Sequence, residues 1–435
     1  MSVERPHMTR SLGLDFGTSN TVAVSGENSS NLGPVFFGKA ADQIASLPTV
    51  LSFLDRGISR PHPEVGPWAI RQFLESTEDV RFIQSLKTFV ASTVFKGTGV
   101  FGTRFEFEDL MATFLAGAEA RCAHRLFDRG TRVVIGRPVV FAGSAPDESV
   151  AMARYRKTLN RFGLDNVLFV YEPVAAAFSF ADRLAHDATV LVADFGGGTT
   201  DYSLMRFRKE AGVLSADPLG RGGIGIAGDT FDYRILDHVV LPEIGKGSHY
   251  QSMGKRLEVP PNLFSNFARW HLLSIFKTSQ DYKELKKLLR WCEDKSKIEL
   301  FIDLVDEDQG YPLFKAVSGA KAKLSSKDSA ELRFAPLGRD FNAPITRTDF
   351  EGWIQDDLAK MGRALDATLI NAGLADDDID HVFMTGGTSF VPAVRRQFQD
   401  RFGVERVSGG DELTSVAKGL AMIGTLEDAE KWAVQ

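Results

Sequence analysis

Two stretches of this chain share one pattern of apolar and polar positions. Each begins with an apolar run, Leu12–Phe16 or Val190–Phe195, in which an aspartate is the next-to-last residue. A turn rich in glycine and hydroxyl residues follows, and then a second apolar run, Val22–Val24 or Tyr202–Met205. Short apolar runs separated by a glycine turn predict strand, tight turn and strand. Two such hairpins predict a duplicated fold whose halves face each other across a cleft.

The first half of the chain alternates predicted strands with predicted helices. A stripe of apolar residues with a period of 3.6, for example, predicts a helix within residues 105–126. This alternation is typical of an α/β fold. Beyond the two hairpins, strands are expected at 35–37, 49–54, 132–138 and 167–171, and helices at 66–75, 80–89, 147–161 and 173–180.

The second half repeats this theme with an insertion. From residue 245 to about residue 300 the pattern predicts long helices, one of them over 281–298. Strands are expected at 313–317, 330–334, 381–385 and 404–407, and helices at 229–240, after Thr346, at 391–402 and at 411–426.

Composition narrows the class of protein. The 435 residues are 43% hydrophobic and 25% charged, which is typical of a globular protein. The formal net charge is −6 and no dense run of Lys or Arg occurs, so nothing indicates nucleic-acid binding. No apolar run approaches the about 20 residues of a membrane helix, and residues 1–11 lack the apolar segment of a signal peptide. Cys122 and Cys292 lie far apart outside any CxxC pair, which predicts reduced thiols and a cytoplasmic location.

The two predicted turns have the chemistry of a phosphate site. Glycine leaves no side chain between the backbone N–H groups and an anion, and Thr and Ser hydroxyls add further donors. Asp15 and Asp194 beside the turns predict a place for a divalent cation. One Asp-Phe-Gly triplet indicates little, but two copies with matching flanks favour this interpretation over two turn-capping aspartates.

Five motifs, in order, resemble the nucleotide-binding half of the DnaK-type heat-shock chaperones. This is the heat shock protein 70 family of the actin-like ATPase superfamily. The resemblance covers about residues 10 to 427. The motifs are residues 14–21, 171–177, 194–201, 297–300 and 383–392.

The resemblance implies an α/β protein with the duplicated actin-like ATPase fold, which is ribonuclease H-like, and two lobes around a nucleotide cleft. Lobe I is then expected at 1–189 and lobe II at 190–408, with the helical insertion at about 245–312. A C-terminal helix within 409–435 is expected to return to lobe I.

The resemblance also implies roles around ATP or ADP and Mg²⁺. Asp15 and Asp194 would hold Mg²⁺ through its water molecules. Lys87 matches the family's catalytic lysine and would orient the attacking water. The implied catalytic residues are Lys87, Glu172, Asp194, Thr199 and Asp201. The implied nucleotide-binding residues are Asp15, Gly17, Thr18, Ser19, Asn20, Gly196, Gly197, Gly198, Thr199, Gly228, Asp229, Asp294, Lys297, Gly386, Gly387, Thr388, Phe390 and Asp411.

Simpler interpretations exist for several of these residues. A helical lysine such as Lys87 is normally solvated, and Glu172 could only complement a helix dipole. Asp294 and Lys297 have the spacing of an ordinary ion pair on a helix surface. Pro138 resembles the family's switch proline but equally well ends a strand. Two overlapping GxGxxG matches within 220–228 lie mid-chain, where a dinucleotide-binding fingerprint is not expected.

The chain departs from the family in three respects. The peptide-binding β-sandwich, helical lid and interdomain linker are not found, so the sequence resembles the truncated, YegD-like branch of the family more than DnaK itself. Phe390 stands where many members carry an arginine that stacks on adenine. Phe301 stands where many carry a serine that bonds the nucleoside.

We therefore expect a chaperone-like ATPase that couples its nucleotide state to lobe opening, with a protein partner or client and no membrane. A second hypothesis is a small-molecule kinase on the same fold, although no additional acid stands out as its base. A third is a non-enzymatic, nucleotide-gated binding or filament protein. Acceptor-dependent ATP consumption would favour the kinase, and nucleotide-dependent sedimentation would favour the filament.

Overall fold

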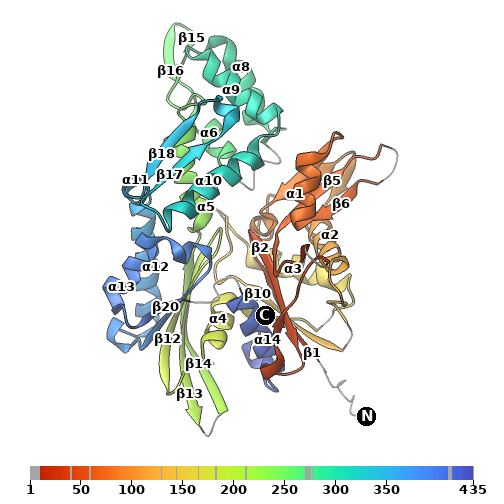
Figure 1. Cartoon of the computed structure of the whole chain (residues 1–435), viewed down its shortest axis with the longest axis vertical. Helices are drawn as coiled ribbons and strands as arrows, with labels where there is room; N and C mark the ends of the chain where they lie inside the picture. The colour runs from red at the N-terminus through yellow and green to blue at the C-terminus, as the bar shows by residue number, and fades with distance from the viewer. Residues whose placement is uncertain are drawn as a thin grey trace. The chain divides into compact units, whose positions relative to one another are not determined.

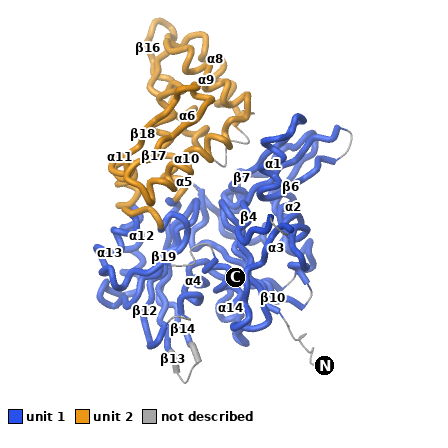
Figure 2. The backbone as a smooth tube through the Cα atoms, in the orientation of Figure 1, with its two compact units in different colours: residues 1–227, 360–389, 394–435 blue, residues 228–359, 390–393 orange. Residues whose placement is uncertain are grey.

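The chain folds into two compact units (Figure 2). Unit 1 comprises residues 1–227, 360–389 and 394–435, and unit 2 comprises residues 228–359 and 390–393. The structure is a computed structural model, and it describes residues 10–39, 42–57, 60–128, 130–143, 145–164, 166–181, 184–210, 213–269, 276–277, 279–409 and 414–434.

The first large sheet of unit 1 is built around the N-terminal hairpin. Its strand order is β11-β10-β1-β2-β3, and β4 also pairs with β2. β1 pairs antiparallel with β2 and parallel with β10, and β10 pairs parallel with β11. These strands are β1 (Arg10–Phe16), β2 (Asn20–Gly26), β3 (Gly33–Pro34), β4 (Ser46–Pro48), β10 (Thr131–Arg137) and β11 (Leu168–Tyr171).

The second large sheet of unit 1 repeats this arrangement. Its strand order is β14-β13-β12-β19-β20. The first three strands pair antiparallel, and β12, β19 and β20 pair parallel. In both sheets, a hairpin is thus followed by two parallel strands, which is the duplication that the sequence predicts. The strands are β12 (Ala188–Phe195), β13 (Thr200–Glu210), β14 (Val213–Ile224), β19 (His381–Thr385) and β20 (Val407–Gly409).

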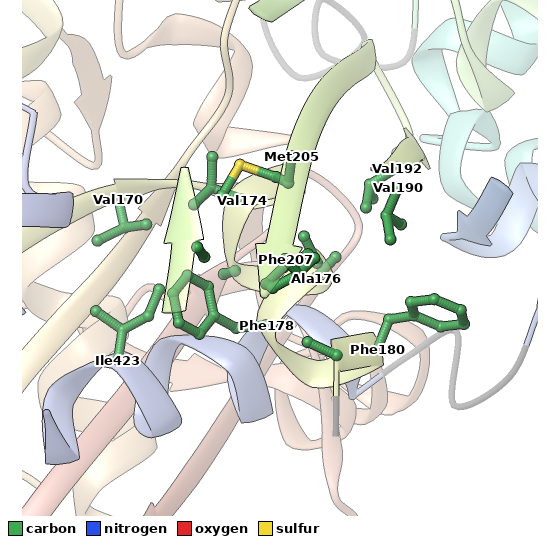
Figure 3. Packing of buried hydrophobic residues seen from close by; sticks show 14 of the residues in the cluster. Val170, Val174, Ala176, Phe178, Phe180, Val190, Val192, Met205, Phe207 and Ile423 are labelled. Atoms are coloured by element: carbon green, nitrogen blue, oxygen red, sulfur yellow. The ribbon is translucent and has the colours of Figure 1, made fainter. Parts of the chain in front are cut away.

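Two helices of unit 1 pack against each other and against the two sheets (Figure 1). α14 (Ser415–Thr425) contacts β1, β2 and β10, whereas α4 (Glu172–Ala181) contacts β12 and β13. All ten residues of α4 are buried. Apolar side chains from both helices and from the second sheet form one core, in which Phe178, Phe207 and Ile423 lie together (Figure 3).

Glycines permit this close packing. A β-carbon at Gly419 of α14 would lie 1.6 Å from the carbonyl oxygen of Ala175 in α4. A β-carbon at Gly13 of β1 would lie 2.2 Å from the carbonyl oxygen of Ala417. No larger residue fits at either position unless the backbone moves.

The remaining part of unit 1 before residue 188 adds small sheets and three helices. α1 packs on β5 and β6, and α2 packs on α3 and β6. The sheets are β6-β5-β7 and β8-β9. The elements are β5 (Val50–Leu54), β6 (His62–Val65), β7 (Val80–Gln84), β8 (Thr98–Val100), β9 (Thr103–Phe105), α1 (Gly66–Glu75), α2 (Phe107–Ala120), α3 (Glu148–Asn160) and the 3₁₀ turns η1 (Ser29–Asn31) and η3 (Leu86–Phe89).

Two further helices pack against strands of the second large sheet. They are α12 (Gln355–Ala372) and α13 (Pro392–Phe402). A β-carbon at Gly222 of β14 would lie 2.0 Å from the hydroxyl oxygen of Thr368 in α12. Phe398 of α13 meets the ring of Phe195 edge-on. The glycines at 220–224 therefore lie in a strand, where Gly222 makes room for α12, and they form no dinucleotide-binding turn.

Unit 2 is mostly helical, with two hairpins. α5 packs against α10 and α11, α10 packs on β17, and α6 packs on α8. The hairpins are β15 (His249–Ser252) with β16 (Lys255–Glu258) and β17 (Ser329–Arg333) with β18 (Asn342–Thr346). The helices are α5 (Gly228–Ile235), α6 (Pro261–Phe267), α8 (Gln280–Leu288), α9 (Lys295–Asp306), α10 (Gly310–Leu324) and α11 (Arg347–Trp353). Single turns are η4 (Leu236–Val240), η6 (Leu289–Trp291) and η7 (Ala335–Leu337) in unit 2, and η8 (Asp376–Asp378), η9 (Gly387–Phe390) and η10 (Ala429–Trp432) elsewhere.

Four predicted elements are wrong. No strand forms at 35–37: β3 ends at Pro34, and of these residues only Phe37 makes isolated bridges. Residues 80–89 form β7 and η3, because pairing with β5 overrides the local helical pattern. The helix expected over 281–298 is interrupted at Cys292, whose extended backbone pairs with Tyr250. Residues 313–317 lie in α10, whose buried Leu313, Val317, Ala320 and Leu324 have helical spacing. The region expected to contain only long helices also holds the hairpin β15–β16.

Candidate functional site

The two predicted hairpins bring their turns together in unit 1. Asp15 is paired with Val22 in the first hairpin, and Asp194 is paired with Asp201 in the second. A β-carbon at Gly198 would lie 3.8 Å from the hydroxyl oxygen of Thr18, so the tips of the hairpins approach each other. The first turn holds Gly17, Thr18 and Ser19, with Asn20 opening β2; the second holds Gly196, Gly197, Gly198 and Thr199.

Glycine is required by the geometry of the first turn. A β-carbon at Gly17 would lie 2.3 Å from the carbonyl oxygen of Asn20. The second turn is closed by a hydrogen bond from the Gly196 amide to the Thr199 carbonyl, at 2.9 Å. Both turns thus place backbone amides and hydroxyls at adjacent tips, as a phosphate site requires.

Lys87 and Glu172 form an ion pair beside these turns. The Lys87 ammonium lies 2.5 Å from a carboxylate oxygen of Glu172, and each side chain is only 9% exposed. Burial lowers the pKa of Lys87, but electrostatic interactions with Glu172, Tyr155 and Asp15 outweigh this effect and raise the pKa above its ordinary range. Lys87 therefore remains an ammonium at neutral pH.

The aspartates around this pair hold protons unusually tightly. Burial raises the pKa of Asp15 to about 7, repulsion from Glu172 adds to the rise, and Lys87 opposes it. Burial, together with repulsion from Glu172, Asp15 and Asp201, also raises the pKa of Asp194 well above its usual range. The cluster therefore has more carboxylates than its single lysine can neutralise.

Asp201 forms hydrogen bonds with the backbone of the residues that follow Pro138. One of its carboxylate oxygens accepts hydrogen bonds from the amides of Val139 and Val140, at 2.9 and 3.1 Å. Burial and the charge of Glu172 raise its pKa to about 7, although these amides and the Thr199 hydroxyl lower it. Asp201 thus links the second hairpin to the end of β10.

The donor set fits Mg²⁺ with a phosphate ligand. A divalent cation would stabilise the ionised forms of Asp15 and Asp194, which burial and mutual repulsion now disfavour. Mg²⁺ prefers oxygen ligands and retains several of its waters. In the described part of the chain, no three His, Cys, Asp or Glu side chains are grouped so that they could hold a metal ion by themselves.

The loop after β19 packs on the second turn. Gly386 has a φ of +82°, and a β-carbon there would lie 2.2 Å from the carbonyl oxygen of Phe195. The Thr388 hydroxyl donates to the Gly196 carbonyl at 3.3 Å. Gly387 has open space on the side where a β-carbon would lie. The structure therefore brings Gly386, Gly387 and Thr388 to the phosphate turns.

The other predicted residues belong to unit 2 or lie outside the described residues. Gly228 and Asp229 open α5, and burial raises the pKa of Asp229 to about 6, with repulsion from Asp232 added and Lys321 opposing. Phe390 is about half exposed. Asp411 lies outside the described residues.

Asp294 and Lys297 have hydrogen-bond partners of their own. Asp294 accepts from the Ser248 hydroxyl at 3.0 Å, and Lys297 donates to the Pro242 carbonyl at 2.8 Å. Lys321 of α10 instead reaches the Gly228 carbonyl and Asp232, both at 2.9 Å. The sequence pattern predicts a strand at 313–317 and not the helix α10, so it does not single out Lys321.

Phe301 is not a base-binding residue. It is fully buried inside unit 2, where its ring packs against Phe264, Phe267 and Phe276. Phe264, Phe267 and Phe276 lie well before Phe301 in the sequence, so the residues around Phe301 do not predict that these rings bury it.

Sequence reasoning also missed Tyr155 of α3. Its side chain is fully buried, and its hydroxyl has no hydrogen-bond partner among the described residues. Burial and the neighbouring Glu172 raise the pKa of Tyr155 to about 12, although Lys87 opposes this. The helical pattern of α3 indicated only that this face is buried.

The duplicated sheets and the paired turns define an α/β protein with the two-lobed actin-like ATPase fold. A model of the family described as "Hsp70 protein" matches residues 92–252 and 281–432, well over half of the chain. The chain therefore belongs to the Hsp70 family.

Members of this family bind ATP or ADP with Mg²⁺, hydrolyse ATP and act on client proteins. In the described part of the chain, no helix has the length and apolar character needed to cross a membrane.

Proposed function

We propose that this chain binds ATP with Mg²⁺ and hydrolyses it slowly, well below the about 10 s⁻¹ typical of enzymes. Its nucleotide state would control the opening of the two lobes. The observation that carries the proposal is the buried Lys87–Glu172 ion pair, which lies among Asp15 and Asp194 at the meeting point of two glycine turns.

In this proposal the turns bind the phosphates. The amides and hydroxyls of Thr18, Ser19, Gly197, Gly198 and Thr199 would donate to phosphate oxygens. Mg²⁺ would neutralise charge on those oxygens, held by Asp15 and Asp194 through its waters. The support for this is the approach of Gly198 to Thr18 and the raised pKa values of both aspartates.

Phosphoryl transfer depends mainly on positioning and on neutralising charge. Lys87 would hold the attacking water and offset charge on the γ-phosphoryl, while Glu172 fixes the lysine. Thr199 and Asp201 would lie next to the γ-phosphoryl. Asp201 also accepts hydrogen bonds from the amides after Pro138. Loss of the γ-phosphoryl beside Asp201 would therefore alter the position of that segment.

Gly386 and Gly387 are proposed to let the backbone approach the nucleoside, and the open space at Gly387 supports this assignment. Gly228 with Asp229, as a phosphate-side turn, and Phe390 are proposed from the resemblance. Asp294, Lys297 and Asp411 remain proposals from the resemblance alone.

We also propose that the chain belongs to the YegD-like branch and works in the cytoplasm. The proposed branch rests on the sequence resemblance alone. The two cysteines are free thiols, which suits a reducing compartment. A client or partner protein is expected from the family.

Purified protein tests this function directly. MgATP should bind, and single-turnover hydrolysis should depend on Mg²⁺. Lys87→Met and Thr199→Ala should lower the hydrolysis rate more than they lower nucleotide affinity, since both residues act on the reacting group. If the wild-type protein neither binds nor hydrolyses ATP, the proposal is wrong.

A further inference from the structure

Lys87 depends on a turn that has little regular structure of its own. It lies in η3, a single 3₁₀ turn that follows Ser85, whose φ of +54° is in the left-handed region. The chain from Val90 to Phe95 then continues without helix or paired strand, apart from one bridge between Ser92 and Pro146. Carbonyl groups at the end of such a turn need partners from elsewhere in the protein.

One side chain supplies most of those partners. Arg154 of α3 donates from Nη1 to the carbonyl oxygens of Phe89, Val90 and Ser92, at 2.7, 3.0 and 3.0 Å. Its Nη2 donates to the carbonyl oxygen of Phe95 at 2.5 Å. The guanidinium carbon also lies 5.5 Å from the centre of the Phe107 ring of α2.

We infer that Arg154 is a positioning residue for Lys87, because it holds the turn that aims the ammonium at Glu172. This inference rests on the proposed function of Lys87. Nothing in the sequence pattern distinguishes Arg154 from the other basic residues of α3.

The geometry of arginine explains why this residue suits the position. A planar guanidinium has five N–H donors in a fixed fork, so one side chain binds several carbonyls with little further loss of entropy. Its positive charge also complements the carbonyl ends of the peptide dipoles at the end of a helical turn. A lysine in the same place has three donors around one point and cannot span the same four carbonyls.

A backbone hydrogen bond would still hold the segment after η3 near α3 if Arg154 were replaced. The amide of Asp147, the N-cap residue of α3, donates to the Ala91 carbonyl at 2.9 Å. Loss of the arginine is therefore expected to loosen the Lys87 turn and to leave the rest of α3 folded.

Arg154→Met and Arg154→Lys test the inference, with Arg156→Met as the matched control, because Arg156 is an exposed residue of the same helix. The first readout is the rate at which an amine-reactive acylating reagent modifies Lys87 in the nucleotide-free protein, followed by mass spectrometry. Lys87 is now buried and protonated, so the wild-type rate should be low. We expect at least about a tenfold increase in Arg154→Met, a smaller increase in Arg154→Lys and none in Arg156→Met.

The second readout is the hydrolysis rate. A displacement of about 1 Å can reduce a rate by about 100-fold, so Arg154→Met should lower single-turnover hydrolysis by about 10- to 100-fold. The dissociation constant of MgADP should change less than about twofold. In a Lys87→Met background, Arg154→Met should lower the rate by less than about twofold, because the positioned group is gone.

The two readouts separate the possible failures. An unchanged modification rate of Lys87 in both Arg154 variants overturns the inference, whether or not the protein hydrolyses ATP. Wild-type protein without ATPase activity, but with faster Lys87 modification in Arg154→Met, rejects the proposed function and supports the positioning role. If Arg154→Met does not fold, as judged by circular dichroism, Arg154→Lys decides by the same criteria.

Discussion

The ammonium of Lys87 and the carboxylate of Glu172 lie 2.5 Å apart, and the protein buries both groups. Lys87 lies in η3, after β7, whereas Glu172 begins α4 on the edge of the core. The pair therefore joins two elements that meet only in the folded chain. Its neighbours are further carboxylates, so the stability of the fold and the proposed function would depend on the same charges.

Lys87→Met should destabilise the nucleotide-free protein. The substitution leaves Glu172 buried without its cation, which typically costs about 3 to 5 kcal/mol. Urea unfolding at pH 8 measures the change. Lys157→Met is the control, since Lys157 pairs with Glu106 and Glu108 at the surface and should contribute less than about 1 kcal/mol. Equal effects of the two substitutions would argue against a structural role for the buried pair.

Asp194→Asn should stabilise the nucleotide-free protein at pH 8 while weakening MgATP binding. The folded-state pKa of Asp194 lies above its unfolded value, because burial and like charges disfavour the ionised form. The stability it contributes is complete below the unfolded pKa and is lost as the pH rises through the folded pKa. At pH 8 the protein with the amide should be more stable than the protein with the carboxylate, and at pH 4 the two should be nearly equal.

Thermal and urea unfolding at both pH values measure this difference. A stabilisation of the same size at pH 4 and pH 8 would mean that packing, and not charge, is responsible.

Binding of MgADP should release protons near neutral pH. Burial raises the pKa of Asp15 to about 7 and also raises the pKa of Asp194, so the free protein retains protons on this pair near neutral pH. A cation beside them lowers these pKa values, and roughly one proton should leave at pH 7. Calorimetry in two buffers with different ionisation enthalpies measures the number. Asp194→Asn is the control and should release fewer protons, while proton uptake in the wild-type protein would contradict the charge model.

Gly419→Ala should disrupt the contact between α14 and α4. The new β-carbon would lie 1.6 Å from the Ala175 carbonyl oxygen, so the helices must separate. Overpacking of this kind typically costs about 1 to 3 kcal/mol or more. Gly319→Ala in α10 is the matched control: it lies inside a helix with open space around the added carbon, and it should be neutral or stabilise by up to about 1 kcal/mol. Melting temperatures of the two variants provide the comparison.

The hairpins at Asp15 and Asp194 could be predicted from sequence because their signal is local. An apolar run, a glycine turn and a second apolar run specify strand, turn and strand without help from distant residues. The helices α1, α2, α3 and α4 were also found, since each carries an apolar face or a clear boundary residue such as Asp147.

The failures have long-range causes. β7 is a strand because β5 offers it a pairing edge, and α8 stops near Cys292 because the following backbone pairs with Tyr250. Phe301 is buried by three rings that its own neighbourhood does not contain. The spacing of residues along the chain does not predict the ion pair between Lys87 and Glu172. It also does not predict the hydrogen bonds from Arg154 to the carbonyl groups after η3.

The packing of α14 on β1 also affects how the chain folds during its synthesis. β1 starts at Arg10, whereas the helix that packs on it ends at Thr425. At a synthesis rate of about 5 to 20 residues per second, the ribosome needs about 20 to 80 s to make the intervening chain. Throughout that time the face of β1 that α14 covers in the folded protein lacks this partner. We expect this growing chain to bind chaperones until α14 has emerged from the ribosome.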